Sequence, residues 1–264
     1  MRKVMKMSLP VAIQLFSLDN ELEKDCRGTL KALRDMGYDG VEVCGTTYDM
    51  SYDEFNEYCK SIGLEVVSAH YSIDTMSSRP DEIYGEFSKM GTKYIAVPYL
   101  VRDQLPGGER YGETLEKFLE AGKKAHEYGM QLLYHNHNQE FEKLGDKYLL
   151  DIFLEDAGAY LLGAEYDVCW IKFSGEDPAD YIERNAQRCR VVHLKDYYIQ
   201  RGIKAERPEF RPVGYGCQDV PSIIDSAKKV GAEWLIVEQD KPSLDKSPLE
   251  CAEMSIKYLK IVNK

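Results

Sequence analysis

The chain has 264 residues, of which 44% are hydrophobic and 30% are charged, and its formal net charge is −11 at pH 7. This length suits one large globular domain, and one (β/α)₈ barrel typically takes about 250 residues. The acidic balance argues against binding to nucleic acid or to acidic membranes, because both need a basic protein surface. No apolar run reaches the roughly 18 residues of a membrane-spanning helix, and the N-terminus lacks the long apolar segment of a secretion signal.

The seven cysteines are dispersed along the chain and include no C-x-x-C pair. An odd number of scattered thiols is typical of a reducing compartment rather than of a disulfide framework. We therefore expect a cytoplasmic protein that binds neither nucleic acid nor membrane. The sequence leaves open whether the chain forms a homo-oligomer.

Short apolar runs alternate with amphipathic stretches of helical spacing along the whole chain. In chain order, the runs predicted to be strands lie near 11–17, 40–44, 65–70, 93–98, 131–136, 160–167, 190–196 and 233–238. Glycine follows several predicted helices, as in Met36-Gly37, and proline begins others, as in Asp177-Pro178. This repetition favours parallel βα units and predicts an α/β fold, a single-domain (β/α)₈ TIM barrel over residues 1–264. An open doubly wound sheet is the alternative, but no G-x-G-x-x-G follows the first strand.

Two segments that follow predicted strands are longer than the turns around them. Ser72–Arg79 follows the third strand, and Tyr197–Gln218 follows the seventh and contains Gly214 and Gly216. Because the loops after barrel strands surround the active site, we expect both to cover a substrate, with surface decoration as the alternative. The two glycines are also a candidate phosphate cradle, although no Walker-type loop is present and a phosphorylated substrate is not implied.

Four apolar runs in the second half of the chain lead into side chains that bind divalent metals. They end, in chain order, at His135-Asn-His137 with Glu140 just beyond, at Asp167, at His193 and at Glu238. Ligands at the carboxyl ends of successive strands converge only if those strands lie side by side in one parallel sheet. Three carboxylates and one imidazole form a site of mostly hard oxygen donors, which favours Mn²⁺ or Mg²⁺ over structural zinc.

Alternation of side chains along each strand adds residues to the same end of the barrel. His193 and Lys195 share one face of their strand, and Glu165 and Asp167 share one face of theirs. A buried lysine needs a partner, so Lys195 is a candidate for moving a proton, provided that its pKa is lowered.

Polar residues also end the earlier strands. Gln14 lies on the first, Glu42 ends the second and His70 ends the third. We expect His70 and Gln14 to lie at the mouth of the active site. For Glu42, a contact with substrate and a structural ion pair are equally open.

Taken together, these motifs resemble those of the sugar phosphate isomerase/epimerase family, the xylose isomerase-like TIM barrels. The resemblance extends from about Val11 to near the C-terminus. It rests on Ile-Gln14-Leu-Phe-Ser17, Gly-Tyr-Asp-Gly-Val-Glu42, Tyr134-His-Asn-His137-x-x-Glu140-Phe, Asp167-x-x-Trp170, His193-Leu-Lys195-Asp196 and Val-Glu238-Gln-Asp240. The Tyr-His-Asn-His version is similar to branches that act on keto-sugars or inososes.

The resemblance implies a metal site made by a carboxylate of the fifth strand together with Asp167, His193 and Glu238. Epimerases of the family carry one glutamate on that strand and a second one six residues later. The alignment of motifs puts Tyr134 at the first position and Glu140 at the second. We expect Glu140 to reach the metal, and substitution by His135 or His137 is the alternative.

The expected site therefore holds one divalent metal, Mn²⁺ by preference and otherwise Mg²⁺, Co²⁺ or Zn²⁺. Its expected ligands are Glu140, Asp167, His193 and Glu238. The expected catalytic residues are Glu140, Glu238 and Lys195. The expected substrate-binding residues are Gln14, Glu42, His70, His135, His137 and Trp170.

We expect a metal-dependent carbohydrate isomerase or epimerase that acts through an enediolate on a keto-sugar or a polyol-derived ketone. A lyase or dehydratase of inosose or keto-glycoside type, on the same metal site, is the first alternative. A non-catalytic sugar-binding barrel subunit is the second. DNA-repair endonucleases share this barrel, but they need a three-zinc cluster and more than the five histidines of this chain.

Overall fold

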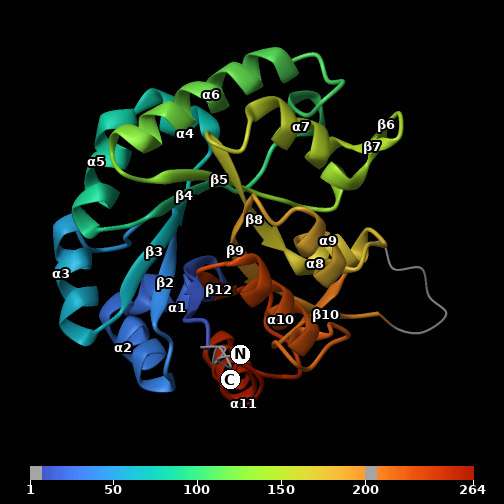
Figure 1. Cartoon of the computed structure of the whole chain (residues 1–264). Coiled ribbons are helices and arrows are strands. Elements are labelled where there is room, and N and C mark those ends of the chain that lie inside the picture. The colour runs from blue at the N-terminus through green and yellow to red at the C-terminus, as the bar shows by residue number, and fades with distance from the viewer. Residues whose placement is uncertain (1–7, 200–206) are drawn as a thin grey trace, which may run out of the picture.

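The computed structural model describes residues 8–199 and 207–264, and eight of its strands close into a barrel (Figure 1). These strands are β1 (Val11–Gln14), β2 (Gly40–Cys44), β3 (Glu65–His70), β4 (Tyr94–Val97), β5 (Gln131–His135), β8 (Leu162–Asp167), β9 (Cys189–Leu194) and β12 (Trp234–Val237). Neighbours in the barrel are neighbours in this order, β12 pairs with β1, and the pairings are parallel. The prediction of a (β/α)₈ barrel is confirmed.

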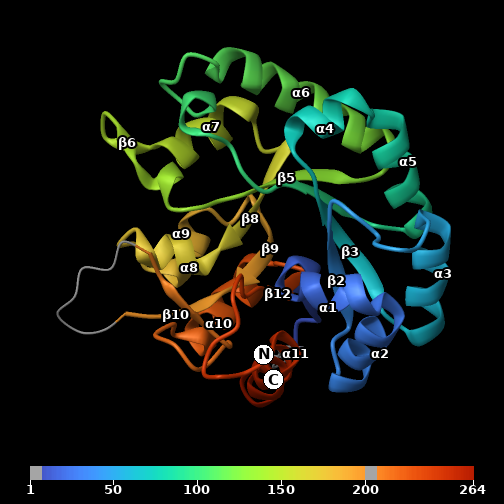
Figure 2. The same cartoon turned by 180° about the vertical axis from the view of Figure 1, so that it is seen from behind.

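Helices surround the barrel, as both views show (Figures 1 and 2). They are α1 (Asp19–Lys24), α2 (Cys26–Met36), α3 (Tyr52–Ile62), α4 (Ile73–Ser78), α5 (Pro80–Met90), α6 (Tyr111–Glu127), α7 (Leu149–Ala157), α8 (Val168–Phe173), α9 (Pro178–Arg184), α10 (Val220–Val230) and α11 (Pro248–Val262). Short 3₁₀ helices η1 (Leu15–Leu18), η2 (Arg102–Gln104) and η3 (Gln139–Phe141) lie between them. Two hairpins stand outside the barrel, β6 (Lys143–Leu144) with β7 (Lys147–Tyr148) and β10 (Asp196–Tyr198) with β11 (Glu209–Arg211). Among the described residues, no helix is long and apolar enough to cross a membrane.

Local sequence explains where the helices begin and end. Ser51 caps α3 by accepting a hydrogen bond from the backbone N–H of Glu54, and the Glu54 carboxylate accepts one from the backbone N–H of Ser51. The same helix ends at Gly63, which has a φ of 75°. A left-handed residue of this kind satisfies the last carbonyls of a helix, and glycine adopts it without steric cost.

The core has two parts because successive side chains of a strand point to opposite faces. The inside of the barrel is filled by Ala12, Val67, Tyr94, Ala96, Leu133, Val191, Trp234 and Ile236. The other face of the strands packs against the helices in a larger cluster, where Tyr134 contacts the rings of Phe118 and Phe153. This division decides which residue at each strand end points into the barrel.

Two local expectations were wrong, and a third stays a prediction. The first strand ends at Gln14 rather than near position 17, because the Gln14 side chain accepts a hydrogen bond from the backbone of Phe16 and η1 begins. Ser72–Arg79 is not a loop, since Ser72 caps the helix α4. In the segment Tyr197–Gln218, β10 and β11 form a hairpin, and residues 200–206 lie outside the described residues.

Candidate metal centre and active site

Buried polar side chains gather at the carboxyl-terminal ends of the barrel strands. They are Gln14, Glu42, His70, His135, Glu165, Asp167, His193, Lys195 and Glu238, each of them at most 7% exposed. They continue the inward-facing positions of their strands, as His193 does two residues after Val191. The convergence of Asp167, His193 and Glu238 that the sequence suggested is therefore present in the structure.

Two groups of four side chains place their ligand atoms within 4.8 Å of one another in the described part of the chain. The Asp167 group consists of His135, Asp167, His193 and Glu238. The Glu165 group consists of His70, His135, Glu165 and His193. The two groups share both His135 and His193, so the orientation of these two rings decides how each group can bind an ion.

His193 presents a different ring nitrogen to each group. Its Nδ1 lies 2.9 Å from Oε2 of Glu238. Its Nε2 lies 2.8 Å from Oε2 of Glu42 and 3.0 Å from Oε1 of Glu165. A carboxylate that accepts the N–H of one ring nitrogen leaves the lone pair on the other nitrogen. Glu42 and Glu165 are therefore placed to orient His193 toward the Asp167 group.

His135 is held in the same manner. Its Nδ1 lies 3.2 Å from Oε1 of Glu165, and its Nε2 lies 3.7 Å from Oδ2 of Asp167. Burial lowers the pKa of His135 to about 4, so the ring is neutral at physiological pH and can act as a metal ligand.

The site holds more carboxylates than cationic side chains. Around Lys195 lie Asp167, Glu238 and Asp240, and next to them Glu42 and Glu165. Burial raises the pKa of Asp167 to about 6, and burial together with the charge of Glu165 raises the pKa of Glu42. Oε1 of Glu42 and Oε2 of Glu165 are buried and have no hydrogen-bond partner among the described residues. Buried negative charge needs a counter-charge, and the donor set fits a divalent cation.

Lys195 is fixed by three carboxylates. Its Nζ lies 3.2 Å from Asp167 Oδ2, 3.0 Å from Glu238 Oε2 and 2.9 Å from Asp240 Oδ1. Burial disfavours the ammonium, but Asp167 and Glu238 outweigh it and raise the pKa of Lys195 well above its usual range. The expectation of a lowered pKa was wrong, and Lys195 holds its proton.

Glu140 lies in neither ligand group. Tyr134 points outward to α6 and α7, and its hydroxyl donates to Oε1 of Glu140 at 2.6 Å. The backbone N–H of His137 donates to Oε2 of Glu140 at 2.8 Å. Because Leu133 faces into the barrel, the inward-facing residue at the end of β5 is His135 and not Tyr134. His135, and not Glu140, therefore occupies the inward-facing position at which the sequence suggested a metal ligand from the fifth strand.

A cavity of about 270 Å³ opens next to these groups, and His70, His135, His137, Lys195 and Glu238 line it. Within residues 8–199 and 207–264, Nδ1 of His137 has no hydrogen-bond partner. Burial lowers the pKa of His137 to about 2, so this ring is neutral and can accept a hydrogen bond from a substrate hydroxyl.

The remaining predicted substrate-binding residues lie elsewhere. Gln14 donates to Oε2 of Glu42 at 2.7 Å, and the same oxygen lies 2.8 Å from Nε2 of His193, so Gln14 and Glu42 hold the His193 ring from within the barrel. Trp170 lies beside His137, with ring centroids 5.3 Å apart, and lines a neighbouring cavity.

Three residues of the site were absent from the sequence-based set. Glu165 shares the inward face of β8 with Asp167, so strand alternation pointed to it. Asp240 follows Glu238 at the same two-residue spacing. The side chain of Asn136 exchanges two hydrogen bonds with the backbone of Asp167, at 3.3 and 3.1 Å, and no sequence signal announces this contact.

The expectation that Gly214 and Gly216 could bind a phosphate was wrong. The backbone N–H groups of Gly214 and Gly216 donate to Oδ2 of Asp196 at 3.0 and 2.9 Å, and that of Gln218 donates to Oδ1 at 3.1 Å. The carboxylate of Asp196 thus takes the place that a phosphate would need.

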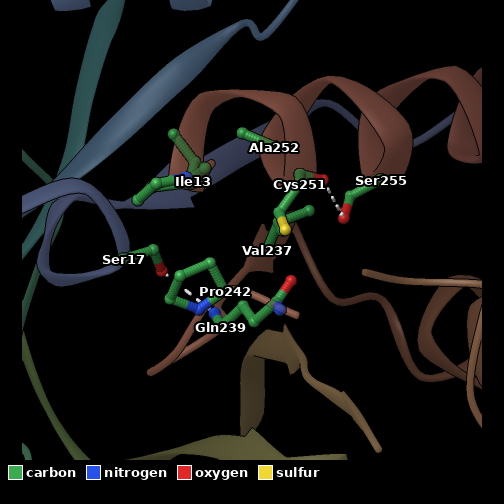
Figure 3. A pocket seen from close by; sticks show the side chains of 9 residues that line it. Ile13, Ser17, Val237, Gln239, Pro242, Cys251, Ala252 and Ser255 are labelled. Atoms are coloured by element: carbon green, nitrogen blue, oxygen red, sulfur yellow. Dashed lines mark hydrogen bonds between the residues drawn. The ribbon is translucent and has the colours of Figure 1, made fainter. Parts of the chain in front are cut away.

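A small pocket between β1, β12 and α11 is shown in Figure 3. Its volume is about 10 Å³, enough for about one water molecule and no substrate. The backbone N–H of Gln239 donates to Oγ of Ser17 at 3.0 Å here, which ties the chain just after Glu238 to η1 (Figure 3).

Known proteins resemble this chain over most of its length. The family model for the xylose isomerase-like TIM barrel matches residues 30–261. An inosose dehydratase of Geobacillus thermodenitrificans (strain NG80-2) is 24% identical over 257 residues, which are 85% of each chain. A sugar phosphate isomerase/epimerase structure from Parabacteroides distasonis ATCC 8503 has a TM-score of 0.77 at 21% identity and covers 98% of this chain and 96% of its own. An IOLI protein with a bound zinc atom has a TM-score of 0.75 at 14% identity, covering 96% and 98%.

Proposed function

The chain belongs to the family of xylose isomerase-like TIM barrels, and from this we propose that it is a divalent-metal-dependent enzyme acting on a polyhydroxy ketone. In this proposal the enzyme removes a proton from the carbon next to the ketone. One observation carries the proposal: the ligand atoms of His135, Asp167, His193 and Glu238 converge within 4.8 Å of one another, and His135 and Glu238 also line the cavity.

The Asp167 group is the ligand set that we propose. Two imidazoles and two carboxylates are softer donors than the three carboxylates and one imidazole expected from the sequence. This change favours Mn²⁺, Co²⁺ or Zn²⁺ over Mg²⁺. A divalent ion bound there polarises a carbonyl and so makes the adjacent C–H more acidic.

Glu238 is the proposed base. Burial favours its neutral form, but Lys195 and His193 outweigh burial and hold the pKa of Glu238 well below its usual range. Its carboxylate lines the cavity and can take a proton from carbon. Lys195 keeps its proton and can donate a hydrogen bond to a substrate oxygen, while His137 accepts one from a hydroxyl.

We place elimination, as in a dehydratase, ahead of isomerisation. Both reactions begin with the same proton transfer, but epimerisation needs an acid or base on each face of the carbon. The end of β5 supplies the imidazole of His135 where a second carboxylate would have served, and inosose dehydratases match this chain over most of their length. Isomerisation or epimerisation is the second candidate, favoured by the fold that the chain shares with the sugar phosphate isomerase/epimerase structures.

Turnover in heavy water separates the two reactions. The purified chain, loaded with Mn²⁺, Co²⁺ or Zn²⁺, is mixed with scyllo-inosose and with simple ketohexoses in D₂O. Elimination gives an unsaturated ketone that absorbs in the ultraviolet, whereas isomerisation introduces deuterium at carbon without loss of water. A Glu238→Gln variant with its metal content measured is the control. Absence of product and of exchange in the native chain would contradict the proposal and favour a non-catalytic sugar-binding barrel.

A further inference from the structure

A second set of donor atoms lies around Glu165, which precedes Asp167 by two residues on the inward face of β8. Oε1 of Glu165 lies 2.6 Å from Nε2 of His70, and Oε2 of Glu42 lies 3.2 Å from the same nitrogen. The three side chains come from β2, β3 and β8 (Figure 1). Atoms that bind one divalent ion lie roughly 3 Å apart, because each is about 2.0–2.2 Å from the ion. These donors therefore have the spacing of a ligand set.

Hydrogen bonds alone do not satisfy the two carboxylates of this set. Nε2 of His70 carries at most one hydrogen, so it cannot donate fully to both Glu42 and Glu165. Nε2 of His193 also lies between the same carboxylates, 2.8 Å from Glu42 Oε2 and 3.0 Å from Glu165 Oε1. The second oxygen of each carboxylate is buried and has no hydrogen-bond partner in the described part of the chain. A cation that contacts both carboxylates would satisfy what these hydrogen bonds leave unpaired.

The charges at this end of the barrel point in the same direction. Five carboxylates lie here, four of them buried and the last half-buried: Glu42, Glu165, Asp167, Glu238 and Asp240. Lys195 forms ion pairs with the last three of them. An ion in the Asp167 group, whose imidazoles bind as neutral ligands, balances two charges, and Lys195 balances one. The two negative charges that remain equal the positive charge of one further divalent ion.

We propose that Glu42, His70 and Glu165 bind a second divalent ion, here called the inner ion. The proposed function needs one ion, in the Asp167 group, so this inference goes beyond it. Two carboxylates and one imidazole are mostly hard donors, which favours Mn²⁺ at the inner site. Three protein ligands leave further coordination positions for water or for a substrate oxygen. His70 lines the cavity of about 270 Å³, so the inner ion borders the space proposed for the substrate.

Counting bound ions tests the inference without turnover. The metal-free native chain is titrated with Mn²⁺ alone by calorimetry, and native mass spectrometry counts the ions that stay bound. We expect two ions per chain. Their electron paramagnetic resonance spectra should be coupled, because the rings of His135 and His193 belong to both groups of ligand atoms. One ion per chain at saturating Mn²⁺, or two ions without coupling, would overturn the inference.

Variants assign each ion to its ligands. His70→Ala removes the imidazole of the inner site, and Glu42→Gln removes a charge from it in case the first variant folds poorly. Each should bind one Mn²⁺ where the native chain binds two. Asp167→Asn should lose the other ion, and its combination with His70→Ala should lose both. His126→Ala is the matched control and should keep two ions, because His126 lies on α6, stacked on Tyr160 outside the barrel.

Two results with these variants would also contradict the inner site. The first is that His70→Ala and Glu42→Gln, folded as judged by circular dichroism, both keep two ions. The second is that the combination of Asp167→Asn with His70→Ala loses no more metal than either change alone. The heavy-water assay tests the reaction separately. A chain that turns over substrate with one bound ion would contradict the inner ion alone, and a chain that binds two ions without turnover would contradict the proposed function alone.

Discussion

Oε1 of Glu165 lies 3.2 Å from Nδ1 of His135, although the two residues belong to different strands. If this nitrogen carries the proton, the lone pair of the ring remains on Nε2, which faces Asp167. The same carboxylate oxygen lies 3.0 Å from Nε2 of His193. One buried glutamate thus orients both imidazoles of the Asp167 group.

Replacing Glu165 by Gln should weaken metal binding without removing a ligand. The variant keeps the size of the side chain but loses the charge that orients His135 and His193. We expect the affinity for Mn²⁺ or Zn²⁺ to fall by about 10–100-fold, as is usual when a partner of a metal-ligating histidine is lost. Competition against a chelating dye measures the change, and circular dichroism checks that the fold is kept. A native affinity in the variant would show that Glu165 does not orient the ligands.

His135→Ala and Glu140→Gln separate the two assignments of the fifth-strand ligand. We expect His135→Ala to lose most of its bound metal, because a donor of the Asp167 group is removed. Glu140→Gln should bind metal like the native chain, since its carboxylate is occupied by Tyr134 and by the backbone of His137. Metal content after gel filtration, measured by mass spectrometry, decides between them. Loss of metal in Glu140→Gln alone would restore the expectation made from the sequence.

The fold was predictable because its signals are local and repeated. Each βα unit buries one apolar face, and turns such as Met36-Gly37 mark where a helix ends. Asp167 and His193 were predictable for a similar reason, since each ends an apolar run and points inward. The inward-facing residue at the end of the fifth strand was harder to predict, because a shift of one residue reverses the face of every side chain in a strand. Only the packing of Tyr134 against Phe118 and Phe153 shows that it faces the helices.

Longer-range contacts explain what else the sequence did not predict. Glu165 was visible as a partner of Asp167 in strand alternation, but its role depends on His135 and His70, which are 30 and 95 residues away. The charge state of Lys195 was wrongly expected for the same reason. Its pKa is set by Asp167 and Glu238, and the distances to them come from the closed barrel.

Metal affinity should rise with pH between about 5 and 8. Burial raises the pKa of Asp167 to about 6, so protons compete with the metal for this carboxylate below that pH. Burial would lower the pKa of His193, but Glu165 and Glu42 outweigh it and raise it well above its usual range, so this ring must also lose a proton. Calorimetric titrations in buffers of different ionisation enthalpy measure both the affinity and the protons released. An affinity that does not change with pH would contradict this prediction.

The same carboxyl affects the stability of the metal-free chain. The pKa of Asp167 rises from its ordinary value of 3.8 to about 6 on folding, so the folded state binds this proton more tightly than the unfolded state. The contribution of Asp167 to the free energy of unfolding is therefore greatest at low pH and is lost as the pH rises through about 6. In an Asp167→Asn variant the free energy of unfolding should not fall in this way as the pH rises. Urea unfolding of the metal-free native chain and of the variant at pH 5 and pH 7.5 measures the difference. An equal pH dependence in both proteins would exclude Asp167 as its source.

Lys195→Met should make the stability of the chain depend more strongly on metal. The ammonium of Lys195 is 1% exposed and faces Asp167, Glu238 and Asp240, so its removal leaves two buried carboxylates and a half-buried one without their cation. Breaking a buried ion pair in this way typically costs about 3–5 kcal/mol. A bound divalent ion supplies positive charge at the same carboxylates, so Mn²⁺ should raise the Tm of the variant more than that of the native chain. Differential scanning calorimetry with and without metal measures the two shifts.

Lys117→Met is the matched control, because Lys117 also faces two carboxylates but is 32% exposed, where such pairs contribute about 0–1 kcal/mol. Equal shifts in the native chain and in Lys195→Met would mean that the metal and Lys195 do not share these carboxylates.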